Sequence, residues 1–439
     1  MADTVQTATG GDGGVDADLA ARIIEEVDRG FEDQVAFLQD LVRYPSQRGQ
    51  EHTAQDFLHD AFAGRGLKMD RWSIDVAEIE NHPGFSPVNV SYDNAVNVVG
   101  THQPRQATGR SLILNGHVDV VPVGPLDMWT TPPYEPRVEG DWLYGRGSGD
   151  MKAGIAANLF AFDALRRAGV QPAATVYMQS VTEEECTGNG ALSCLARGYH
   201  ADAVLIPEPT HDCLVRANVG VLWFQVEVRG RPAHVHESGS GSSAILAAYK
   251  LMEGLQALEA EMIAERGDHP GFEEMAKPIT INVGKIAGGD WASSVPAWCR
   301  FDVRAGFYPG TSAADAKRRV EQALRQSCLD DPFLSNHPPT VTYNGFTAEG
   351  YRLEPGSAAE ACLARAHATV HSTGLSDTTI PAYLDARVAV LYDNTPALVY
   401  GPKSEHIHGF DERVSLHSTR EVTRTIALFM ADWCGVESC

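Results

Sequence analysis

Four short apolar runs, each followed by a histidine or a carboxylate, constrain the fold of this 439-residue chain more than any other feature. The runs are residues 112–114, 176–178, 204–206 and 398–400, and the polar residues after them are His117, Asp119, Glu183, Glu184, Glu185, Glu208, His406 and His408. Short apolar runs bounded by turn residues are typical of buried strands. Because open α/β sheets bind ligands at the carboxyl ends of their strands, the pattern predicts four strands that bring metal-binding types of side chain to one edge of a mostly parallel sheet.

The periodicity around these runs predicts the rest of the first domain. Apolar residues recur at helical spacing from Ile23 to Leu38, which predicts one amphipathic helix that ends before Pro45. Beyond residue 90, apolar runs alternate with helical stretches, as they do in α/β domains. Residues 1–19 are rich in Gly, Asp and Thr and predict a disordered tail.

A segment with a different pattern interrupts this domain. A predicted strand at 221–228 is followed by a helix at 242–265, strands near 279–286 and 296–304, a helix near 312–327 and a strand near 339–344. This β-α-β-β-α-β order is typical of a ferredoxin-like α+β unit. We therefore divide the chain into the tail at 1–19, an α/β domain at 20–215 and 345–439, and an inserted domain at 216–344.

Charge and cysteine content narrow the possible partners and location. The formal net charge is −23, so we expect no binding to the phosphate backbone of nucleic acids. The sequence contains no run of 18 apolar residues, which a membrane-spanning helix would need. Its first 19 residues also lack the basic start and apolar core of a secretory signal. Eight cysteines without a Cys-x-x-Cys pair favour a reducing compartment. We therefore expect a cytoplasmic protein without a membrane partner.

Asp150 lies in a glycine-rich turn, Gly-Arg-Gly-Ser-Gly-Asp-Met-Lys at 145–152, just before a predicted helix. The turn lacks the Gly-Lys-Ser/Thr of a phosphate-binding loop and the third glycine of a dinucleotide-binding loop. Two interpretations of Asp150 remain open. It is either a metal-binding carboxylate, or an aspartate that interacts favourably with the dipole of the following helix.

The histidine and the carboxylates at the strand ends also have two interpretations each. His117 and Asp119 are two residues apart, so both can face one crevice, with Asp119 orienting the imidazole; alternatively they are a turn histidine and a solvated aspartate. The run 183–185 is either a solvated charge run or a set in which one carboxylate binds metal and another accepts a proton from metal-bound water. Glu208 lies between two prolines that stiffen the backbone presenting it, as suits a metal ligand. The alternative is that Glu208 is an ordinary loop carboxylate.

Other catalytic arrangements are not found in the sequence. It contains no Gly-x-Ser-x-Gly nucleophile turn and no His-Glu-x-x-His helix. Cys186 follows three glutamates, whose charge raises the pKa of a thiol, so we interpret it as a packing residue rather than a nucleophile.

Five motifs in order resemble one known family. They are Leu-Asn-Gly-His-Val-Asp-Val-Val-Pro at 114–122, Gly-Arg-Gly-Ser-Gly-Asp-Met-Lys-Ala-Gly at 145–154, Thr-Glu-Glu-Glu at 182–185, Pro-Glu-Pro at 207–209 and His-Gly-Phe-Asp-Glu-Arg-Val at 408–414. The chain is similar to the two-metal aminoacylase family, which includes acetylornithine deacetylase, succinyl-diaminopimelate desuccinylase and carboxypeptidase G type enzymes. The resemblance runs from about residue 20 almost to the end, and it implies a zinc-peptidase type catalytic domain with an inserted lid and dimerisation domain.

The resemblance also implies roles for individual residues. Asp150 would bridge two divalent metals, with His117 and Glu208 completing one site and Glu185 and His408 the other. Glu184 would be the general base and acid, and Asp119 the partner of His117. His406 competes with His408, but His408 holds the family position before Asp-Glu. Ligands of nitrogen and oxygen suit Zn²⁺ first, with Mn²⁺ and Co²⁺ as alternatives.

The inserted domain would contribute to substrate binding and to a homodimer. His234, in Gly-Arg-Pro-Ala-His, matches a family histidine that polarises the substrate carbonyl, often across the dimer, whereas His236 has no match. Arg304 matches an arginine near the substrate carboxylate. Three family positions differ, since this chain has Ser238, Ser243 and Ser293, the last beside Trp291. We therefore predict a substrate other than a standard N-acyl amino acid, with Ser293 and Trp291 at the substrate; Trp223 suits an aromatic group or the lid core.

These observations lead to one leading function and two alternatives. The leading hypothesis is a metal-dependent hydrolase that cleaves an amide or N-acyl C–N bond of a small carboxylate-bearing molecule, by attack of a metal-bound hydroxide with Glu184 as general base and acid. The first alternative is hydrolytic deamination of an aromatic amine at the same metals. The second is a non-catalytic binding protein on this fold, which the intact Glu184 and ligand set argue against.

Overall fold

The computed structural model describes residues 14–329 and 331–439. Most of the tail expected at 1–19 therefore lies outside the described residues. The expected boundary at residue 19 is too late, because helix α1 begins at Ala17. The Asp16 side chain caps this helix and accepts hydrogen bonds from the backbone N–H groups of Asp18 and Leu19.

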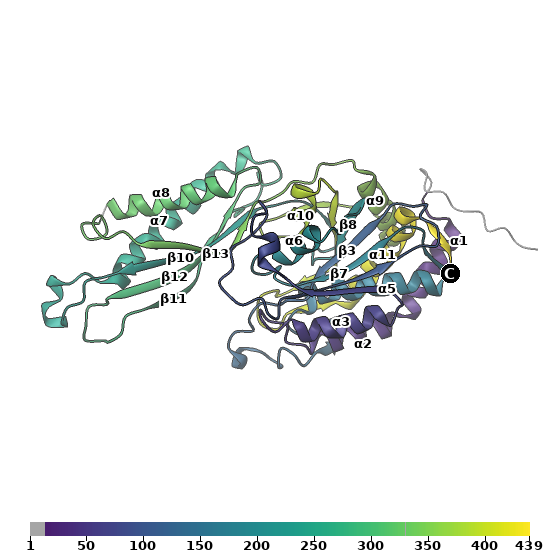
Figure 1. Ribbon diagram of the computed structural model, residues 1–439, viewed down its shortest axis with the longest axis horizontal. Helices are drawn as coiled ribbons and strands as arrows, with labels where there is room; N and C mark the ends of the chain where they lie inside the picture. Colours follow the sequence, from purple (N-terminus) through teal and green to yellow (C-terminus); the bar gives the residue numbers. More distant parts are fainter. Residues whose placement is uncertain (1–13, 330) are drawn as a thin grey trace, which may run out of the picture.

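The central sheet contains the four strands expected from the apolar runs. Its order is β1 (Lys68–Ser73), β2 (Val96–His102), β7 (Val176–Val181), β3 (Leu112–His117), β8 (Ala203–Ile206) and β15 (Ala397–Val399). The last four are mutually parallel, whereas β2 is antiparallel to both of its neighbours. The prediction of a mostly parallel sheet is therefore confirmed, and the carboxyl ends of the four parallel strands lie at one edge (Figure 1).

Helices cover this sheet and complete the main core. They are α1 (Ala17–Arg29), α2 (Phe31–Val42), α3 (His52–Ala63), α5 (Ala153–Arg167), α6 (Asn189–Ala196), α9 (Ala358–His371), α10 (Ala386–Tyr392) and α11 (Leu416–Cys434), with a short α4 (Val76–Ile79). The long helices α5 and α11 pack on each other and on β3. The core between them and the sheet includes Leu114, Ile155, Leu159, Met178, Leu205 and Phe429.

The single first helix that the periodicity predicts is two helices in the structure. Gly30 ends α1 and precedes α2, because glycine is a poor helix former. A Cβ at this position would lie 2.4 Å from Nη2 of Arg167, which is the far end of a flexible side chain and could move aside. Apolar periodicity alone does not reveal the break, because the apolar spacing continues across this glycine.

Small sheets complete the catalytic domain. One has the order β16 (Ser404–Glu405), β17 (Arg413–Ser415), β5 (Trp142–Tyr144) and β4 (Arg137–Glu139), and another pairs β6 (Val170–Pro172) with β18 (Val436–Ser438). A third pairs β9 (Leu214–Asn218), which leads into the insert, with β14 (Asp377–Ile380). Among the described residues, no helix is both long enough and apolar enough to cross a bilayer.

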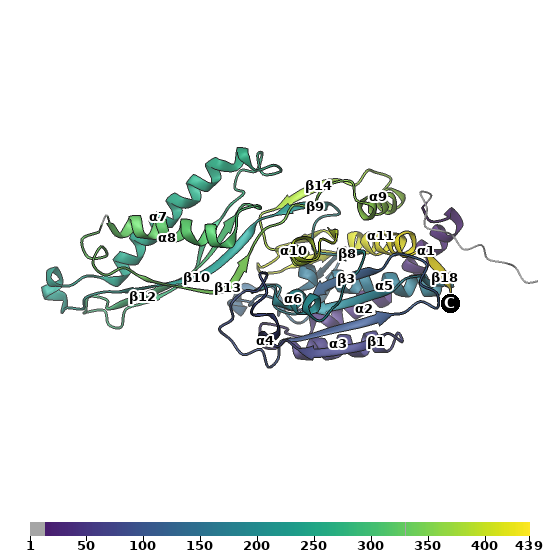
Figure 2. The same cartoon turned by 45° about the horizontal axis from the view of Figure 1, so that its top comes forward.

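The inserted segment forms a second body with its own sheet, which we call the lid. Its elements are β10 (Gly220–Arg229), α7 (Ala244–Ala264), β11 (Ile281–Gly288), β12 (Trp298–Phe307), α8 (Ala313–Leu329) and β13 (Thr340–Ala348). The strands are antiparallel in the order β11-β12-β10-β13, which confirms the ferredoxin-like prediction. Both helices lie on one face of this sheet (Figures 1 and 2).

The two faces of the lid sheet differ in character. Buried residues that face the helices, such as Phe224, Val226, Phe301 and Val303, form the lid core with α7 and α8. Because side chains alternate along a strand, Trp223 and Arg304 belong to the opposite, helix-free face. This face lies next to the strand ends of the catalytic domain.

Candidate metal centre

The strand ends bring the predicted metal ligands together. His117 is the last residue of β3, Glu208 follows β8 by two residues, and Glu185 follows β7 by four. His408 lies in the loop between β16 and β17, and Asp150 lies in the turn Ser148–Lys152 that leads into α5. Ligand atoms of His117, Asp150 and Glu185 all lie within 4.8 Å of one another.

Asp150 lies between the two histidines. Its Oδ1 is 3.1 Å from His117 Nε2, and its Oδ2 is 3.3 Å from His408 Nε2. Glu208 Oε1 lies 3.6 Å from His117 Nε2, and Glu185 Oε1 lies 3.1 Å from His408 Nε2. The two oxygens of Asp150 thus face two groups of candidate ligands, His117 with Glu208 and Glu185 with His408, and the assignment of each group to one metal stays a prediction.

His406, the competing candidate, does not join this cluster. Its side chain is exposed, and its backbone carbonyl accepts a hydrogen bond from Gly409 N–H. Both histidines have left-handed backbone angles, with φ of 59° at His406 and 60° at His408. Of the two, His408 is the one whose Nε2 lies near Asp150 (3.3 Å) and Glu185 (3.1 Å).

A buried ion pair holds the backbone of Asp150 in place. Glu412 Oε1 accepts hydrogen bonds from the N–H groups of Gly149 (3.0 Å) and Asp150 (3.1 Å). Its other oxygen pairs with Arg146 Nη1 at 2.6 Å, and both side chains are almost fully buried. Arg146 and Glu412 both lie inside the motifs at 145–154 and 408–414, but no local pattern indicates that they hold the backbone of Asp150.

The three glutamates after β7 have separate surroundings. Glu183 is bound by Arg48, with distances of 2.6 Å to Oε1 and 2.8 Å to Oε2, and by the hydroxyl of Tyr92 at 2.6 Å. The backbone N–H groups of Glu184 and Glu185 point instead to the Asp119 carboxylate, at 3.4 and 3.1 Å. Glu183 is thus neutralised away from the cluster, and only Glu184 and Glu185 line the cavity.

Asp119 acts on His117 through its main chain rather than its carboxylate. His117 Nδ1 lies 2.9 Å from the Asp119 carbonyl oxygen and 3.6 Å from Oδ1. The expected carboxylate–imidazole hydrogen bond is therefore replaced by a carbonyl contact, because the carboxylate turns towards the 184–185 backbone. An N–H donated from Nδ1 leaves the Nε2 lone pair facing Asp150 and Glu208.

Burial and mutual repulsion make this cluster a site for cations. Burial raises the pKa of Glu184 and of Glu208 well above the usual carboxylate range, and the neighbouring carboxylates raise it further against the opposing effect of His117. Glu185 is the largest cause of a raised pKa at His408, to about 11, although the His408 side chain is about half exposed. Divalent cations would relieve this excess of negative charge, so the residues present fit the metals that the family resemblance implies.

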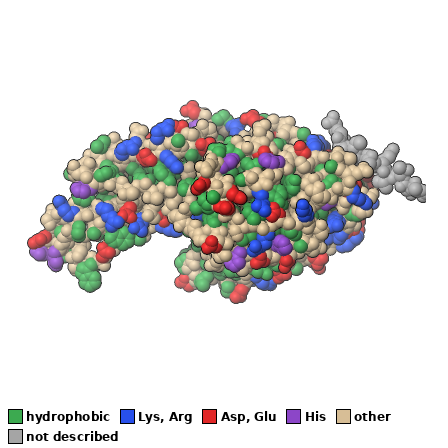
Figure 3. All heavy atoms as spheres, in the orientation of Figure 1, with side chains coloured by type: hydrophobic (Ala, Val, Ile, Leu, Met, Phe, Trp, Pro, Cys, Tyr) green, Lys and Arg blue, Asp and Glu red, His purple; other side chains and the backbone are tan. Residues whose placement is uncertain are grey.

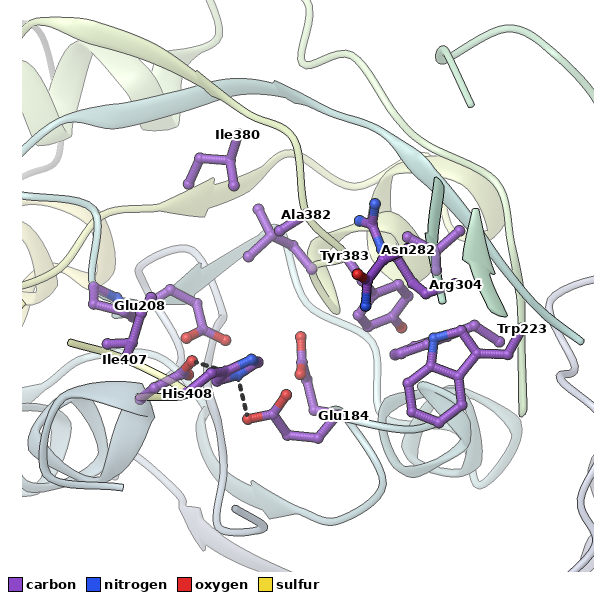
Figure 4. A pocket seen from close by; sticks show the side chains of 16 residues that line it. Glu184, Glu208, Trp223, Asn282, Arg304, Ile380, Ala382, Tyr383, Ile407 and His408 are labelled. Atoms are coloured by element: carbon purple, nitrogen blue, oxygen red, sulfur yellow. Dashed lines mark hydrogen bonds and ion pairs between the residues drawn. The ribbon is translucent and has the colours of Figure 1, made fainter. Parts of the chain in front are cut away.

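A cavity of about 460 Å³ lies between this cluster and the lid. The residues that line it are Asp150, Glu184, Glu185, Glu208, Pro209, Val221, Trp223, Asn282, Arg304, Phe346, Ile380, Ala382, Tyr383, Leu384, Ile407 and His408. Figure 4 shows Trp223, Asn282, Arg304 and Tyr383 on one side, Glu208 and His408 on the other, and Glu184 between them. Its size is that of a site for a small molecule.

Arg304 is the cationic side chain of this cavity. Its guanidinium donates hydrogen bonds to the backbone carbonyls of Thr280 (3.3 Å) and Pro381 (3.1 Å), and within the described residues it has no carboxylate partner. Burial lowers its pKa to about 10, which leaves it charged at neutral pH. An unpaired guanidinium of this kind suits a substrate anion.

The other predicted substrate residues lie outside the cavity of this chain. Ser293 and Trp291 belong to the loop between β11 and β12, where the Trp291 side chain is 73% exposed. His234 is exposed on the neighbouring segment, with its Nδ1 2.8 Å from that of His236. Neither Ser293 nor Trp291 lines the cavity of this single chain, and their role at the substrate stays a prediction. Cys186 is mostly buried, which raises the pKa of its thiol as expected of a packing residue.

Comparisons with known proteins agree with this site. The family model described as peptidase family M20/M25/M40 matches residues 113–432. An N-formyl-4-amino-5-aminomethyl-2-methylpyrimidine deformylase of Halalkalibacterium halodurans is 29% identical over 94% of this chain and 97% of its own length. A succinyl-diaminopimelate desuccinylase of Methylorubrum extorquens is 28% identical over 89% of this chain and 96% of its own length.

Solved structures share the fold. The di-peptidase Dug1p of Saccharomyces cerevisiae superposes with a TM-score of 0.74 and 15% identity, covering 94% of this chain and 98% of that one. Human carnosine dipeptidase 1 gives a TM-score of 0.72, also with 15% identity, covering 94% and 99%. The arrangement of catalytic domain and lid therefore recurs in proteins whose sequences have diverged widely.

Proposed function

Because the chain belongs to peptidase family M20/M25/M40, we propose that it hydrolyses the amide bond of a small N-acylated amine, with Glu184 as general base and acid. It is a metal-dependent hydrolase of C–N bonds, as the named relatives and the cluster of side chains that could hold a metal together indicate. The observation that carries the proposal is Asp150, which lies between two histidines with the buried Glu184 beside them.

The metal ligands are proposed from the contacts around Asp150. His117 and Glu208 would hold one divalent ion, Glu185 and His408 the other, and Asp150 both. When bound, two such ions activate water and polarise the carbonyl of the substrate. Zn²⁺ is the first choice for this set of nitrogen and oxygen ligands, and Mn²⁺ and Co²⁺ are the alternatives.

Glu184 is proposed to move the proton. Its Oε2 lies 4.0 Å from His117 Nε2, and its carboxylate makes no hydrogen bond to the described residues. The group is therefore available to accept a proton from water and to donate it to the departing nitrogen. The net reaction adds water across the C–N bond and releases a carboxylic acid and an amine.

The substrate is proposed to place its acyl group at the metals and its amine part towards the lid. Arg304 supplies a positive charge for a carboxylate on the amine part. The named relatives remove formyl and succinyl groups, which supports a short acyl group. Deamination of an aromatic amine stays a second candidate, because Trp223, Phe346 and Tyr383 line the same cavity. The binding-protein alternative is not retained for a member of this hydrolase family.

One experiment tests this function directly. Purified protein is analysed for metal content and then assayed on N-formyl, N-acetyl and N-succinyl amines, dipeptides and substituted anilines. We expect turnover of N-acyl amines that stops with chelator and returns with added Zn²⁺, Mn²⁺ or Co²⁺. Release of ammonia from anilines, without cleavage of any N-acyl amine by metal-loaded protein, would overturn the proposal in favour of deamination.

The lid is proposed to form a homodimer. Large apolar side chains are exposed along the lid, namely Val235, Leu246, Tyr249, Ile286 and Trp291. Figure 3 shows apolar side chains at the surface of the lid. His234 lies beside Val235 and outside its own cavity, which supports action on the partner's substrate. Mixing Glu184→Gln with His234→Ala protein should then restore part of the activity, and a monomer by sedimentation or no recovery on mixing would contradict this arrangement.

The cytoplasmic location stays a prediction.

A further inference from the structure

A second group of metal-binding types of side chain lies outside the metal centre, where α9 ends and α11 begins. Glu421 Oε2 lies 3.4 Å from His417 Nε2 and 3.7 Å from His371 Nδ1. His417 and Glu421 are four residues apart on α11 and so share one face of that helix. His371 is the last residue of α9, which packs on α11 (Figure 2). The glutamate carboxylate therefore lies between two imidazoles from different helices.

Both distances are longer than a hydrogen bond but suit two ligands of one ion. An N–H···O bond usually spans about 2.7–3.2 Å, and the His200–Asp393 pair at 2.8 Å is an example elsewhere in this chain. Two ligand atoms that each lie about 2.0–2.1 Å from a tetrahedral Zn²⁺ are about 3.4 Å apart. The Glu421 carboxylate makes no hydrogen bond to the described residues, so its oxygens are available to a cation.

A chain of hydrogen bonds can turn a lone pair of His371 towards Glu421. The Tyr400 hydroxyl lies 2.9 Å from His367 Nδ1 and 3.2 Å from His371 Nε2. Burial lowers the pKa of His367 to about 4, so its imidazole is neutral and can accept. When Tyr400 donates to His367, His371 donates from Nε2 to the Tyr400 oxygen and keeps a lone pair on Nδ1. Such a hydrogen bond from the second ring nitrogen is the usual support of a metal-binding histidine.

The surroundings of this group favour a cation. The two carboxylate oxygens of Asp212 lie 2.9 and 3.2 Å from Ser418 Oγ, and this carboxylate is near enough to interact electrostatically with both His371 and Glu421. The side chains of His371 and Glu421 are 13% and 19% exposed, whereas that of His417 is 61% exposed. Two ligands are thus held by their surroundings, and the third can turn onto an ion that arrives from solvent.

We propose that His371, His417 and Glu421 form a separate site for one Zn²⁺ or a similar transition-metal ion, with water as the fourth ligand. Imidazole and carboxylate ligands suit such ions. The ion joins the end of α9 to the start of α11 and so closes the segment 372–416, which carries His408. It stabilises the fold and takes no part in the chemistry, because none of its three ligands lines the cavity. The inference does not depend on the proposed amide hydrolysis.

The test counts bound Zn²⁺ by equilibrium dialysis and elemental analysis under buffered free Zn²⁺, because a site with one exposed ligand should empty in metal-free buffer. We expect His417→Ala and Glu421→Gln each to bind about one ion fewer per chain than the wild type. His200→Ala is the matched control and should keep the wild-type count, since His200 faces its carboxylate through a direct hydrogen bond. Zn²⁺ should also raise the Tm of the wild type more than that of either variant.

The result is a difference between variants, so it depends neither on how many ions the catalytic cluster holds nor on cleavage of any amide. In His408→Ala protein, which lacks one proposed catalytic ligand, His417→Ala should still remove about one further ion. Circular dichroism establishes that each variant keeps the native fold. If either His417→Ala or Glu421→Gln keeps the wild-type count, or if His200→Ala loses the same ion, the proposed site is wrong.

Discussion

Arg48 and Glu183 form a two-point ion pair, with Nε–Oε1 and Nη2–Oε2 distances of 2.6 and 2.8 Å. The Glu183 side chain is 1% exposed, and its backbone has a left-handed φ of 68°. The turn that follows points Glu184 and Glu185 into the cavity. The ion pair therefore separates a structural carboxylate from two functional ones that are its neighbours in sequence.

Arg48→Met should destabilise the fold, because it leaves the Glu183 carboxylate buried without its partner. We expect the free energy of unfolding to fall by about 3 kcal/mol, measured by urea denaturation, with reduced metal content at the neighbouring ligands. Arg48→Lys should recover part of the loss, and the double variant with Glu183→Gln should recover more. Unchanged stability in Arg48→Met would contradict the role of this pair.

Glu184→Gln should retain its metals and lose turnover, because an amide cannot accept the proton that the carboxylate takes from water. We expect kcat to fall by about 10²- to 10⁴-fold, with metal content unchanged by mass spectrometry. Glu253→Gln, at an exposed position on α7, is the matched control and should keep full activity. Near-normal kcat in Glu184→Gln would remove Glu184 from the mechanism.

Replacing His408 should lower the metal content, whereas replacing the nearby His406 should leave it unchanged. His408→Ala removes the imidazole that faces Asp150 and Glu185, so we expect the protein to lose about one of its two metals. His406→Ala removes an exposed side chain and should keep both. Elemental analysis after dialysis measures the ratio, and loss of metal in His406→Ala alone would reverse the assignment.

Glu51 should make stability depend on pH. The residue is fully buried, and neither of its oxygens has a hydrogen-bond partner in the described part of the chain. Burial and then Asp119 raise its pKa from 4.5 to about 8. A raised carboxylate pKa means that the folded state holds a proton that the unfolded state has released, so this contribution is complete below pH 4.5 and is lost as the pH rises through 8.

Glu51→Gln should therefore match the wild type in unfolding free energy near pH 4.5 and exceed it increasingly up to pH 8. The difference should reach up to about 4 kcal/mol and then stay constant. Urea denaturation at pH 5, 7 and 9 measures it. A difference that does not change with pH would mean that Glu51 is already ionised in the folded protein.

Several features of the site were predictable because they depend on neighbours in sequence. A buried strand and the polar residue that follows it are joined by a few bonds, so the runs before His117 and Glu208 indicated where those side chains would emerge. The same argument predicted the order of strands and helices in the lid. It did not predict the helix break at Gly30, because the apolar spacing continues across that glycine.

The amino-acid sequence by itself indicated the two-part architecture through its periodicity, and its motifs supplied the candidate metal ligands, because both signals are local. Only the tertiary structure revealed the ion pair that neutralises Glu183, since Arg48 reaches it across 135 positions of the chain. It also decided the wall of the cavity, because Trp223, Asn282 and Arg304 become neighbours through strand pairing. Side chains brought together by sheet register carry no local signal, since the pairing of distant strands is set by packing of the whole lid.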